Sequence, residues 1–175
     1  LRDYRALIGT AFQDFQIFSL SVADNVVMGN QTAGGEGVVE KALRHSGALE
    51  RIEALPDGIQ TILTREFDDN GANLSGGEQQ KVAVARAFAK KSVIMLLDEP
   101  SSALDPVAEY TLMQNFVSHC RDRSEGDKIS VFISHRLSSS TVADRIYRME
   151  GGRIAEQGTH AELMGQRGGY AVMFD

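Results

Sequence analysis

The sequence predicts an α/β fold in which a parallel sheet carries an inserted helical subdomain. Two short apolar runs, at 92–97 and 129–133, each end in polar residues, as buried parallel strands do. A helical pattern separates them, and the order strand, helix, strand implies a right-handed crossover in a parallel sheet. A third apolar segment near the amino terminus precedes a long region of helical periodicity. We therefore expect one α/β core with a small helical subdomain.

The composition limits the classes of protein to which this chain can belong. The 175 residues, 42% of them hydrophobic, suffice for one compact domain or a core plus a subdomain. The net charge of −6 argues against a surface that binds nucleic acid by general electrostatics. A single cysteine, Cys120, excludes an internal disulfide and fits a reducing compartment. No apolar run approaches the length of a membrane span, and the first residues lack the layout of a signal peptide, so we expect a soluble chain.

The amino-terminal half is predicted to hold one strand and then helices. The apolar segment 6–12 indicates a short buried strand, and it ends at Gln13 and Asp14. From 21 to 55 the spacing is helical, with Ser21 as a candidate cap and a break at the glycine pair 34–35.

A turn and a loop precede the strongest helix of this half. Pro56-Asp57-Gly58 predicts a turn, and the charged, aperiodic stretch 65–73 predicts an exposed loop. Residues 74–91 indicate a loop that enters a strong helix.

The second half predicts the rest of the sheet. The run 92–97 ends at Asp98 and Glu99, a helix is expected over about 107–123, and the run 129–133 ends at Ser134 and His135. Further on, 145–149 and 153–156 flank Glu150-Gly151-Gly152 and predict a hairpin. Thr159 is expected to cap a closing helix over 159–164.

Polar side chains follow each predicted strand of the sheet. Ligands of parallel sheets bind outside the carboxyl ends of the strands. Taken singly, each polar group has an ordinary structural explanation: a solvated loop residue, a polar strand end, or a residue at the start of a helix. Their convergence on one rim favours a functional site made by four side chains: Gln13, Asp98, Glu99 and His135.

A glycine pair opens the helix that follows residue 74. Ser75-Gly76-Gly77 leaves several backbone N–H groups open at a helix amino terminus, where the helix dipole favours an anion. A phosphate site is one interpretation. The alternative is an ordinary serine-capped helix, which a lone motif of this kind favours.

Three motifs together resemble a known family. LSGGEQQKVAVARA, VIMLLDEPSSALD and SHRLSS follow one another in the order and spacing of ABC-type ATPase domains. AFQDFQIFSLSVADNVVMG resembles the Q-loop segment of exporter-type domains, and GGRIAEQGTHAELM resembles their tail. The resemblance implies part of a P-loop NTPase (RecA-like) sheet. It divides the chain into a core strand leading to the Q-loop (1–13), a helical subdomain with the signature (14–91) and the rest of the core (92–175).

The resemblance also implies roles for the rim residues. Asp98 matches the Walker B aspartate that holds Mg²⁺, and a hard oxygen ligand suits that ion. Glu99 matches the catalytic glutamate that orients the attacking water, and His135 matches the switch histidine at the γ-phosphate. Gln13 matches the Q-loop glutamine, which senses Mg²⁺ and the lytic water and communicates with the membrane domain.

The remaining motifs imply partners. In this family the signature serine and glycines, here Ser75, Gly76 and Gly77, cap the ATP held by a second ABC ATPase domain in a head-to-tail dimer. Ser102 and Asp105 match the D-loop at the dimer seam. The coupling helices of a transmembrane domain are the other expected partner, with no nucleic acid, and the place of action is the cytoplasmic face of the cell membrane.

Two local departures from the family pattern stand out. In the family, an acidic stretch before the signature contacts the coupling helices. The matching residues here are 65–71, with Glu66, Asp68 and Asp69, but they lack the usual Glu-x-Gly motif. Glu78 stands where exporters commonly have glutamine, a change we expect to be tolerated.

The larger departure concerns the phosphate-binding loop. No G-x-x-x-x-G-K-[ST] occurs in the 175 residues. In the family this motif precedes the Q-loop strand, so we expect truncation rather than a degenerate enzyme, and a chain that by itself does not bind ATP normally. The missing strand would leave 129–133 with an unpaired apolar edge, which predicts self-association through that edge or a partly disordered core.

Three functions remain open from the sequence. The first is an ATPase domain that drives export. The second is an ABC-type ATPase of DNA maintenance, which would normally be flanked by coiled coils. The third is a non-catalytic half that contributes only its signature to a partner's site.

Overall fold

The structure is a computed structural model that describes residues 2–28, 35–121, 126 and 128–174. The chain divides into two compact units, Leu1–Ile133 and Ser134–Asp175. Within the described residues, no helix combines the length and the apolar character needed to cross a membrane.

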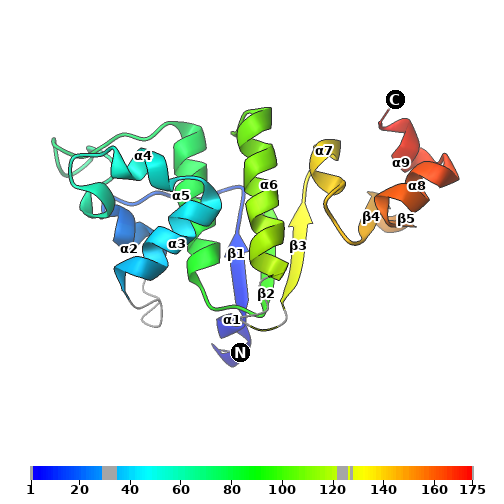
Figure 1. The fold of residues 1–175 in the computed structure, drawn as a ribbon, viewed down its shortest axis with the longest axis horizontal. Helices are drawn as coiled ribbons and strands as arrows, with labels where there is room; N and C mark the ends of the chain where they lie inside the picture. Colours follow the sequence, from blue (N-terminus) through cyan, green and yellow to red (C-terminus); the bar gives the residue numbers. More distant parts are fainter. Residues whose placement is uncertain (1, 29–34, 122–125, 127, 175) are drawn as a thin grey trace. The chain divides into compact units, whose positions relative to one another are not determined.

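A three-stranded parallel sheet forms the centre of the first unit (Figure 1). The short helix α1 (Arg2–Ala6) precedes β1 (Ile8–Ala11), and β2 (Ile94–Asp98) and β3 (Ile129–Ile133) follow in the order β1-β2-β3. The expected parallel sheet is therefore confirmed. The first strand is shorter than the predicted 6–12, because the backbone is helical as far as Ala6.

The crossover helix α6 (Pro106–Arg121) connects β2 to β3. Its start follows from Asp105, whose Oδ1 accepts hydrogen bonds from the N–H groups of Val107 and Ala108, both at 2.9 Å. The helix was expected over 107–123; residues 122 and 123 lie outside the described residues. Cys120 is half-buried in this helix and accepts a hydrogen bond from Ser130 Oγ at 2.7 Å.

Helices between β1 and β2 form the expected helical region. They are α2 (Val22–Val27), α3 (Glu36–Ser46), α4 (Leu49–Glu53), the 3₁₀ turn η1 (Gly58–Gln60) and α5 (Gly76–Ala89). The Ser21 cap is confirmed, because Ser21 Oγ accepts a hydrogen bond from Asp24 N at 3.0 Å. Helix α5 contacts β1, α2 and α3, and its inner positions Val82 to Ala85 are buried. This helix thus joins the helical region to the sheet.

Only one face of the sheet is covered by the described residues of the first unit. Met95 and Leu97 point to the covered face and are each 1% exposed. Leu96, on the other face, is 38% exposed, and the exposed fractions of its neighbours in β3 are 62% for Ile129, 49% for Val131 and 59% for Ile133. The expectation of a strand buried on both faces is therefore wrong for β2. Its continuous apolar run reflects a second face that no described segment of the first unit covers.

The second unit contains a hairpin and three short helices. They are α7 (Leu137–Ser140), β4 (Ile146–Glu150), β5 (Arg153–Gly158), α8 (His160–Gln166) and α9 (Gly169–Val172). The hairpin is confirmed, and its turn places Gly151 and Gly152 at φ 55° and 74°, a conformation that favours glycine.

Side chains accept hydrogen bonds from the first N–H groups of α8 and α9. Thr159 caps α8 as expected, in a capping box with Glu162. The Glu156 carboxylate accepts hydrogen bonds from the N–H groups of Gly169 at 2.6 Å and Tyr170 at 2.8 Å. These backbone hydrogen bonds, reinforced by Arg148, hold the pKa of Glu156 below its usual value.

Candidate functional site

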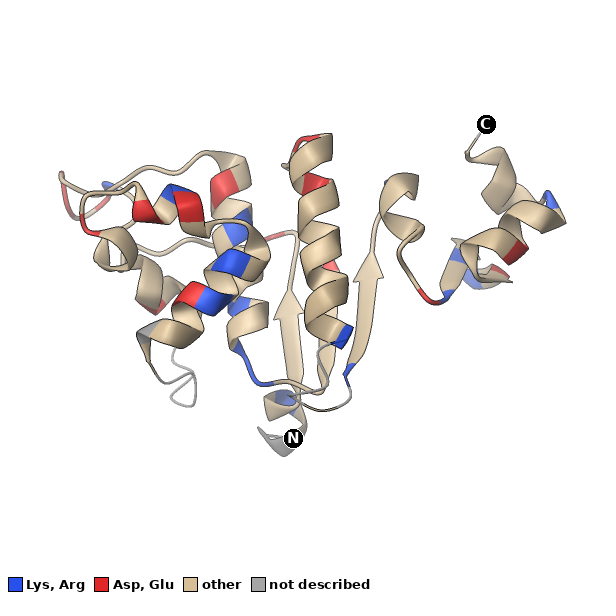
Figure 2. Ribbon diagram, in the orientation of Figure 1, with Lys and Arg blue, Asp and Glu red and all other residues tan. Residues whose placement is uncertain are grey.

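The carboxyl ends of the strands bring Gln13 and the carboxylate pair to one rim. Ala11 lies opposite Leu97 in the sheet register, so Gln13 and Glu99 each follow by two residues. Neighbouring strands lie about 4.8 Å apart, which places both loops side by side. Gln13 is exposed and Asp98 is half-buried. Asp98 is also the one charged residue within β1, β2 and β3, whose ribbons are otherwise tan in Figure 2.

Glu99 has an unusual backbone conformation. Its φ is 47°, in the left-handed region, which costs a residue with a side chain about 1–2 kcal/mol. Its N–H donates to the carbonyl of Ile133 at 3.0 Å, so the end of β3 holds this conformation. Strained backbone of this kind concentrates at functional sites.

His135 lies two residues beyond the end of β3. The structure assigns it to the second unit, which begins at Ser134. There the turn is held by Ser134 Oγ, which accepts from Arg136 N at 3.0 Å, and His135 is exposed. The approach of His135 to the rim therefore stays a prediction from the sequence.

The signature forms the amino terminus of α5. Ser75 is the N-cap residue, and its Oγ accepts from Glu78 N at 3.4 Å while its own N–H donates to Glu78 Oε2 at 2.7 Å. This is a capping box. The ordinary explanation, a serine-capped helix, is thus correct for the local structure. It leaves the phosphate interpretation open, because the N–H groups of the first helical residues have no acceptor within the helix.

The glutamate that departs from the family pattern has a structural role. Glu78 completes the capping box and pairs with Arg51, whose Nε lies 2.7 Å from Glu78 Oε1. Burial by itself raises the pKa of Glu78, but the hydrogen bonds from Ser75 and the Arg51 charge outweigh it and lower the pKa. The carboxylate is therefore charged at neutral pH and favourably placed at the positive end of the helix.

The two signature glycines differ in their surroundings. A Cβ at Gly76 would meet nothing within 4 Å, whereas a Cβ at Gly77 would lie 3.0 Å from the carbonyl oxygen of Ala103. Gly76 is thus open to a ligand or partner. Gly77 is required for close packing against the loop that follows Glu99.

This difference predicts opposite stabilities for two alanine variants. Gly76→Ala should leave the unfolding free energy of the chain unchanged or raise it by up to about 1 kcal/mol through helix propensity. Gly77→Ala should lower it, because overpacking costs about 1–3 kcal/mol and the neighbour is backbone. Urea unfolding of both variants measures the difference. Equal stability of the two variants would contradict the packing role of Gly77.

Sequence reasoning missed a buried polar contact behind the rim. Gln80, on α5, is buried and bonds to the segment 99–103, and Glu109, on α6, accepts from Ser101 Oγ at 3.1 Å. The available signal was a glutamine at an inward position of an amphipathic helix, in line with Val84 four residues later.

The side chains at the rim are suited to a magnesium ion that is bound together with a nucleotide. Mg²⁺ is usually bound through one or two carboxylates, with phosphate oxygens and waters completing the shell. Asp98 places a carboxylate of this kind at the end of β2, and Gln13 carries an amide oxygen at the same rim. Among the described residues, no group of three His, Cys, Asp or Glu side chains forms a self-sufficient metal site. These oxygen donors are therefore suited to a metal ion whose remaining ligands come from a bound phosphate group.

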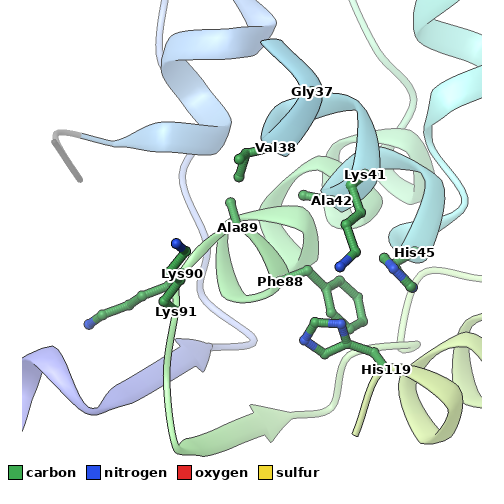
Figure 3. A pocket seen from close by; sticks show the side chains of 10 residues that line it. All are labelled: Gly37, Val38, Lys41, Ala42, His45, Phe88, Ala89, Lys90, Lys91 and His119. Carbon is green, nitrogen blue, oxygen red and sulfur yellow. The ribbon is translucent and has the colours of Figure 1, made fainter. Parts of the chain in front are cut away.

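A separate hollow lies at the other end of α5 (Figure 3). It has a volume of about 200 Å³, and Phe88, His45 and His119 form a contacting aromatic cluster at its wall, with Lys41 directed toward them. Phe88 follows Gly76 by twelve residues on one helix, a separation of about 18 Å. The hollow is thus not part of the rim.

Comparison with known proteins gives consistent matches. The ABC transporter family model matches residues 1–102. The ATP-dependent lipid A-core flippase of Chromobacterium violaceum is 40% identical over 171 residues, which are 98% of this chain and 28% of that protein. The protein of the same name from Burkholderia thailandensis is 42% identical over 98% of this chain and 27% of its own length. A solved bacterial Atm1-family ABC exporter with ATP bound matches with a TM-score of 0.81 and 32% identity, over 97% of this chain and 28% of that one.

The fold and the order of the motifs define the class as the nucleotide-binding domain of an ABC exporter, a P-loop NTPase fold. The chain belongs to the ABC transporter family. Membership implies binding of ATP, typically with Mg²⁺, and the matches favour an exporter over an ATPase of DNA maintenance. The chain spans a little over a quarter of the length of these relatives.

Proposed function

We propose that the full-length protein hydrolyses ATP to drive export across a membrane, and that this chain supplies the hydrolytic rim and the signature. The observation that carries the proposal is the joint presence of Asp98 and Glu99 at the end of β2 and the open glycine of the signature on α5, in a chain of this family. The relatives are named lipid A-core flippases, so an amphipathic lipid is the first substrate class to test.

Each rim residue has a distinct proposed role. Asp98 would hold Mg²⁺, which would supply positive charge opposite the phosphates. Glu99 accepts a hydrogen bond from the attacking water and orients it in line with the γ-phosphate. His135 hydrogen-bonds the γ-phosphate, and Gln13 contacts both the Mg²⁺ shell and the water.

The signature is proposed to act on a nucleotide held by a second ABC ATPase domain. In a head-to-tail dimer, Ser75 and the N–H groups of Gly76 and Gly77 face the partner's ATP, where the helix dipole favours phosphate. The D-loop residues Ser102 and Asp105 lie at the dimer seam. Because Asp105 also caps α6, a displacement of Asp105 at the dimer interface would be transmitted to this crossover helix.

A transmembrane domain is the other proposed partner, at the cytoplasmic face of the membrane. Its coupling helices contact the acidic loop 65–71, where Arg65 Nε donates to the carbonyl of Gly71 at 2.9 Å and closes the loop. Phe67 lies within this loop and is 85% exposed. An aromatic side chain presented in this way is suited to a protein contact.

The domain division expected from the sequence completes the proposal. A core strand (1–13) leads to the Q-loop, a helical subdomain (14–91) carries the signature, and the remainder of the RecA-like core (92–175) carries the carboxylates. Since the 175 residues contain no G-x-x-x-x-G-K-[ST], we propose that this chain alone does not hold ATP.

One comparison of nucleotide binding and hydrolysis tests the proposal. The full-length protein in lipid vesicles should hydrolyse Mg-ATP. The 175-residue chain should show no saturable binding in a calorimetric titration at micromolar nucleotide, because the rim and signature offer too few hydrogen bonds to the phosphates.

Two outcomes would overturn parts of the proposal. Tight Mg²⁺-dependent binding by the 175-residue chain would mean that another of its segments cradles the phosphates. A full-length protein that binds ATP without hydrolysing it would favour the non-catalytic half-site instead.

A further inference from the structure

We infer that Gln80 is a positioning residue that ties the signature helix α5 to the backbone of Glu99, so that the signature and the catalytic carboxylate of one chain move together. The inference rests on the proposed function and adds a route of communication between two nucleotide sites.

The Gln80 side chain makes three hydrogen bonds to the turn after β2, two of them to backbone groups and one to a serine hydroxyl. Its Nε2 donates to the carbonyl oxygen of Glu99 at 3.0 Å and to Ser102 Oγ at 2.9 Å. Its Oε1 accepts from the N–H of Ala103 at 2.8 Å. Gln80 is 2% exposed, so water does not substitute for these partners. One amide thus fixes the segment 99–103 at three points.

A second contact joins the same two segments. Gly77, one turn before Gln80 on α5, approaches the carbonyl of Ala103 so closely that a Cβ would lie 3.0 Å from it. On the other side of the turn, Glu109 of α6 accepts from Ser101 Oγ at 3.1 Å. Glu109 is itself buried. The turn after β2 is therefore held between two helices by buried polar groups.

The direction of the Glu99 side chain depends on this turn. With φ at 47°, Glu99 occupies a conformation that persists only when its surroundings hold it. The N–H of Glu99 is held by Ile133 and its carbonyl by Gln80. Without the Gln80 amide, the carbonyl of Glu99 loses its hydrogen bond, while the N–H of Glu99 remains bonded to Ile133 in the sheet.

The contacts of Gln80 connect the signature, which faces one nucleotide, with the catalytic carboxylate, which faces the other. Ser75, five residues before Gln80 on the same helix, faces the partner's nucleotide in the proposed dimer. Glu99 acts on the nucleotide of its own domain. When the partner's ATP docks on the signature, the displacement of α5 is passed through Gln80 to Glu99, so that closure of one site sets the carboxylate of the other.

Two adjacent glutamines provide a matched test in the full-length protein. Gln80→Met keeps the length of the side chain but removes the amide, whereas Gln79→Met is the control, because Gln79 Nε2 donates to the carbonyl of Leu74 at 2.9 Å beside its own helix end. Misplacement of a catalytic group by about 1 Å costs up to about 100-fold in rate. We expect Gln80→Met to lower kcat by at least about 10-fold with the KM for ATP changed less than about 2-fold. Gln79→Met should change neither by more than about 2-fold.

The outcomes separate this inference from the proposed function. Absence of hydrolysis by the unsubstituted protein would refute the proposed function. Normal hydrolysis with a Gln80→Met kcat within about 2-fold of it, or with only KM altered, would overturn the positioning role. If Gln80→Met does not fold, Gln80→Glu keeps the shape and the acceptor for Ala103 N–H but loses both donated bonds, and the same fall in kcat is expected.

Discussion

Replacement of Glu99 by glutamine is expected to lower ATP hydrolysis by the full-length protein by about 10²–10⁴-fold, the usual contribution of a positioned general base. Glutamine has nearly the same shape, so the left-handed turn held by Ile133 and Gln80 should persist. ATP binding should remain within a few-fold, because the proposed role of Glu99 concerns the water and not the phosphates. Steady-state hydrolysis and a fluorescent-nucleotide titration measure the two effects.

Glu50→Gln is the matched control for this variant. Glu50 is an exposed carboxylate in α4 and should give the hydrolysis rate of the unsubstituted protein. If Glu99→Gln keeps more than about a tenth of the rate, the carboxylate does not act as the base, and the assignment of the rim fails.

The second large effect concerns the sheet. We expect the 175-residue chain to self-associate through β3, and Val131→Lys to convert it to a monomer. Among the described residues β3 pairs only with β2, and Ile129, Val131 and Ile133 all present exposed apolar side chains. Exposed apolar edges recruit other strands, and a charged side chain on the edge strand, lysine above all, is a common natural block.

Sedimentation velocity measures this change directly. Val107→Lys is the control, because Val107 is 76% exposed at the start of α6, away from the strand edge, and should associate like the unsubstituted chain. A monodisperse unsubstituted monomer, or a Val131→Lys variant that associates as before, would contradict the role of this edge.

The parallel sheet and the helix caps were predictable because their causes are local. Apolar runs followed by polar residues specify the strands of a parallel sheet. The caps at Ser21 and Thr159 use a side-chain oxygen three residues from its donor. The strand register, which places Ala11 beside Leu97, then brings Gln13 to the rim. The caps and the strand ends needed no knowledge of distant contacts.

The features missed from the sequence depend on contacts between distant segments. The bonds of Gln80 to residues 99–103 join segments about 20 residues apart, and a helical pattern marks only that a glutamine faces inward. The 38% exposure of Leu96 depends on what covers the second face, which an apolar run does not specify. The short helix α1 was also missed, because Arg2–Ala6 is too short to show a period.

The central claim is that the signature of one chain completes the nucleotide site of another. Its most direct test combines two full-length variants with different tags: Gly76→Glu, which adds a negative side chain where the structure has open space, and Glu99→Gln. Each variant alone should be inactive. Dimers that carry both tags hold one site with an intact Glu99 and an intact partner signature, so hydrolysis should return in them. Doubly tagged dimers that remain as inactive as the two parents would contradict the claim and place the signature on the nucleotide of its own chain.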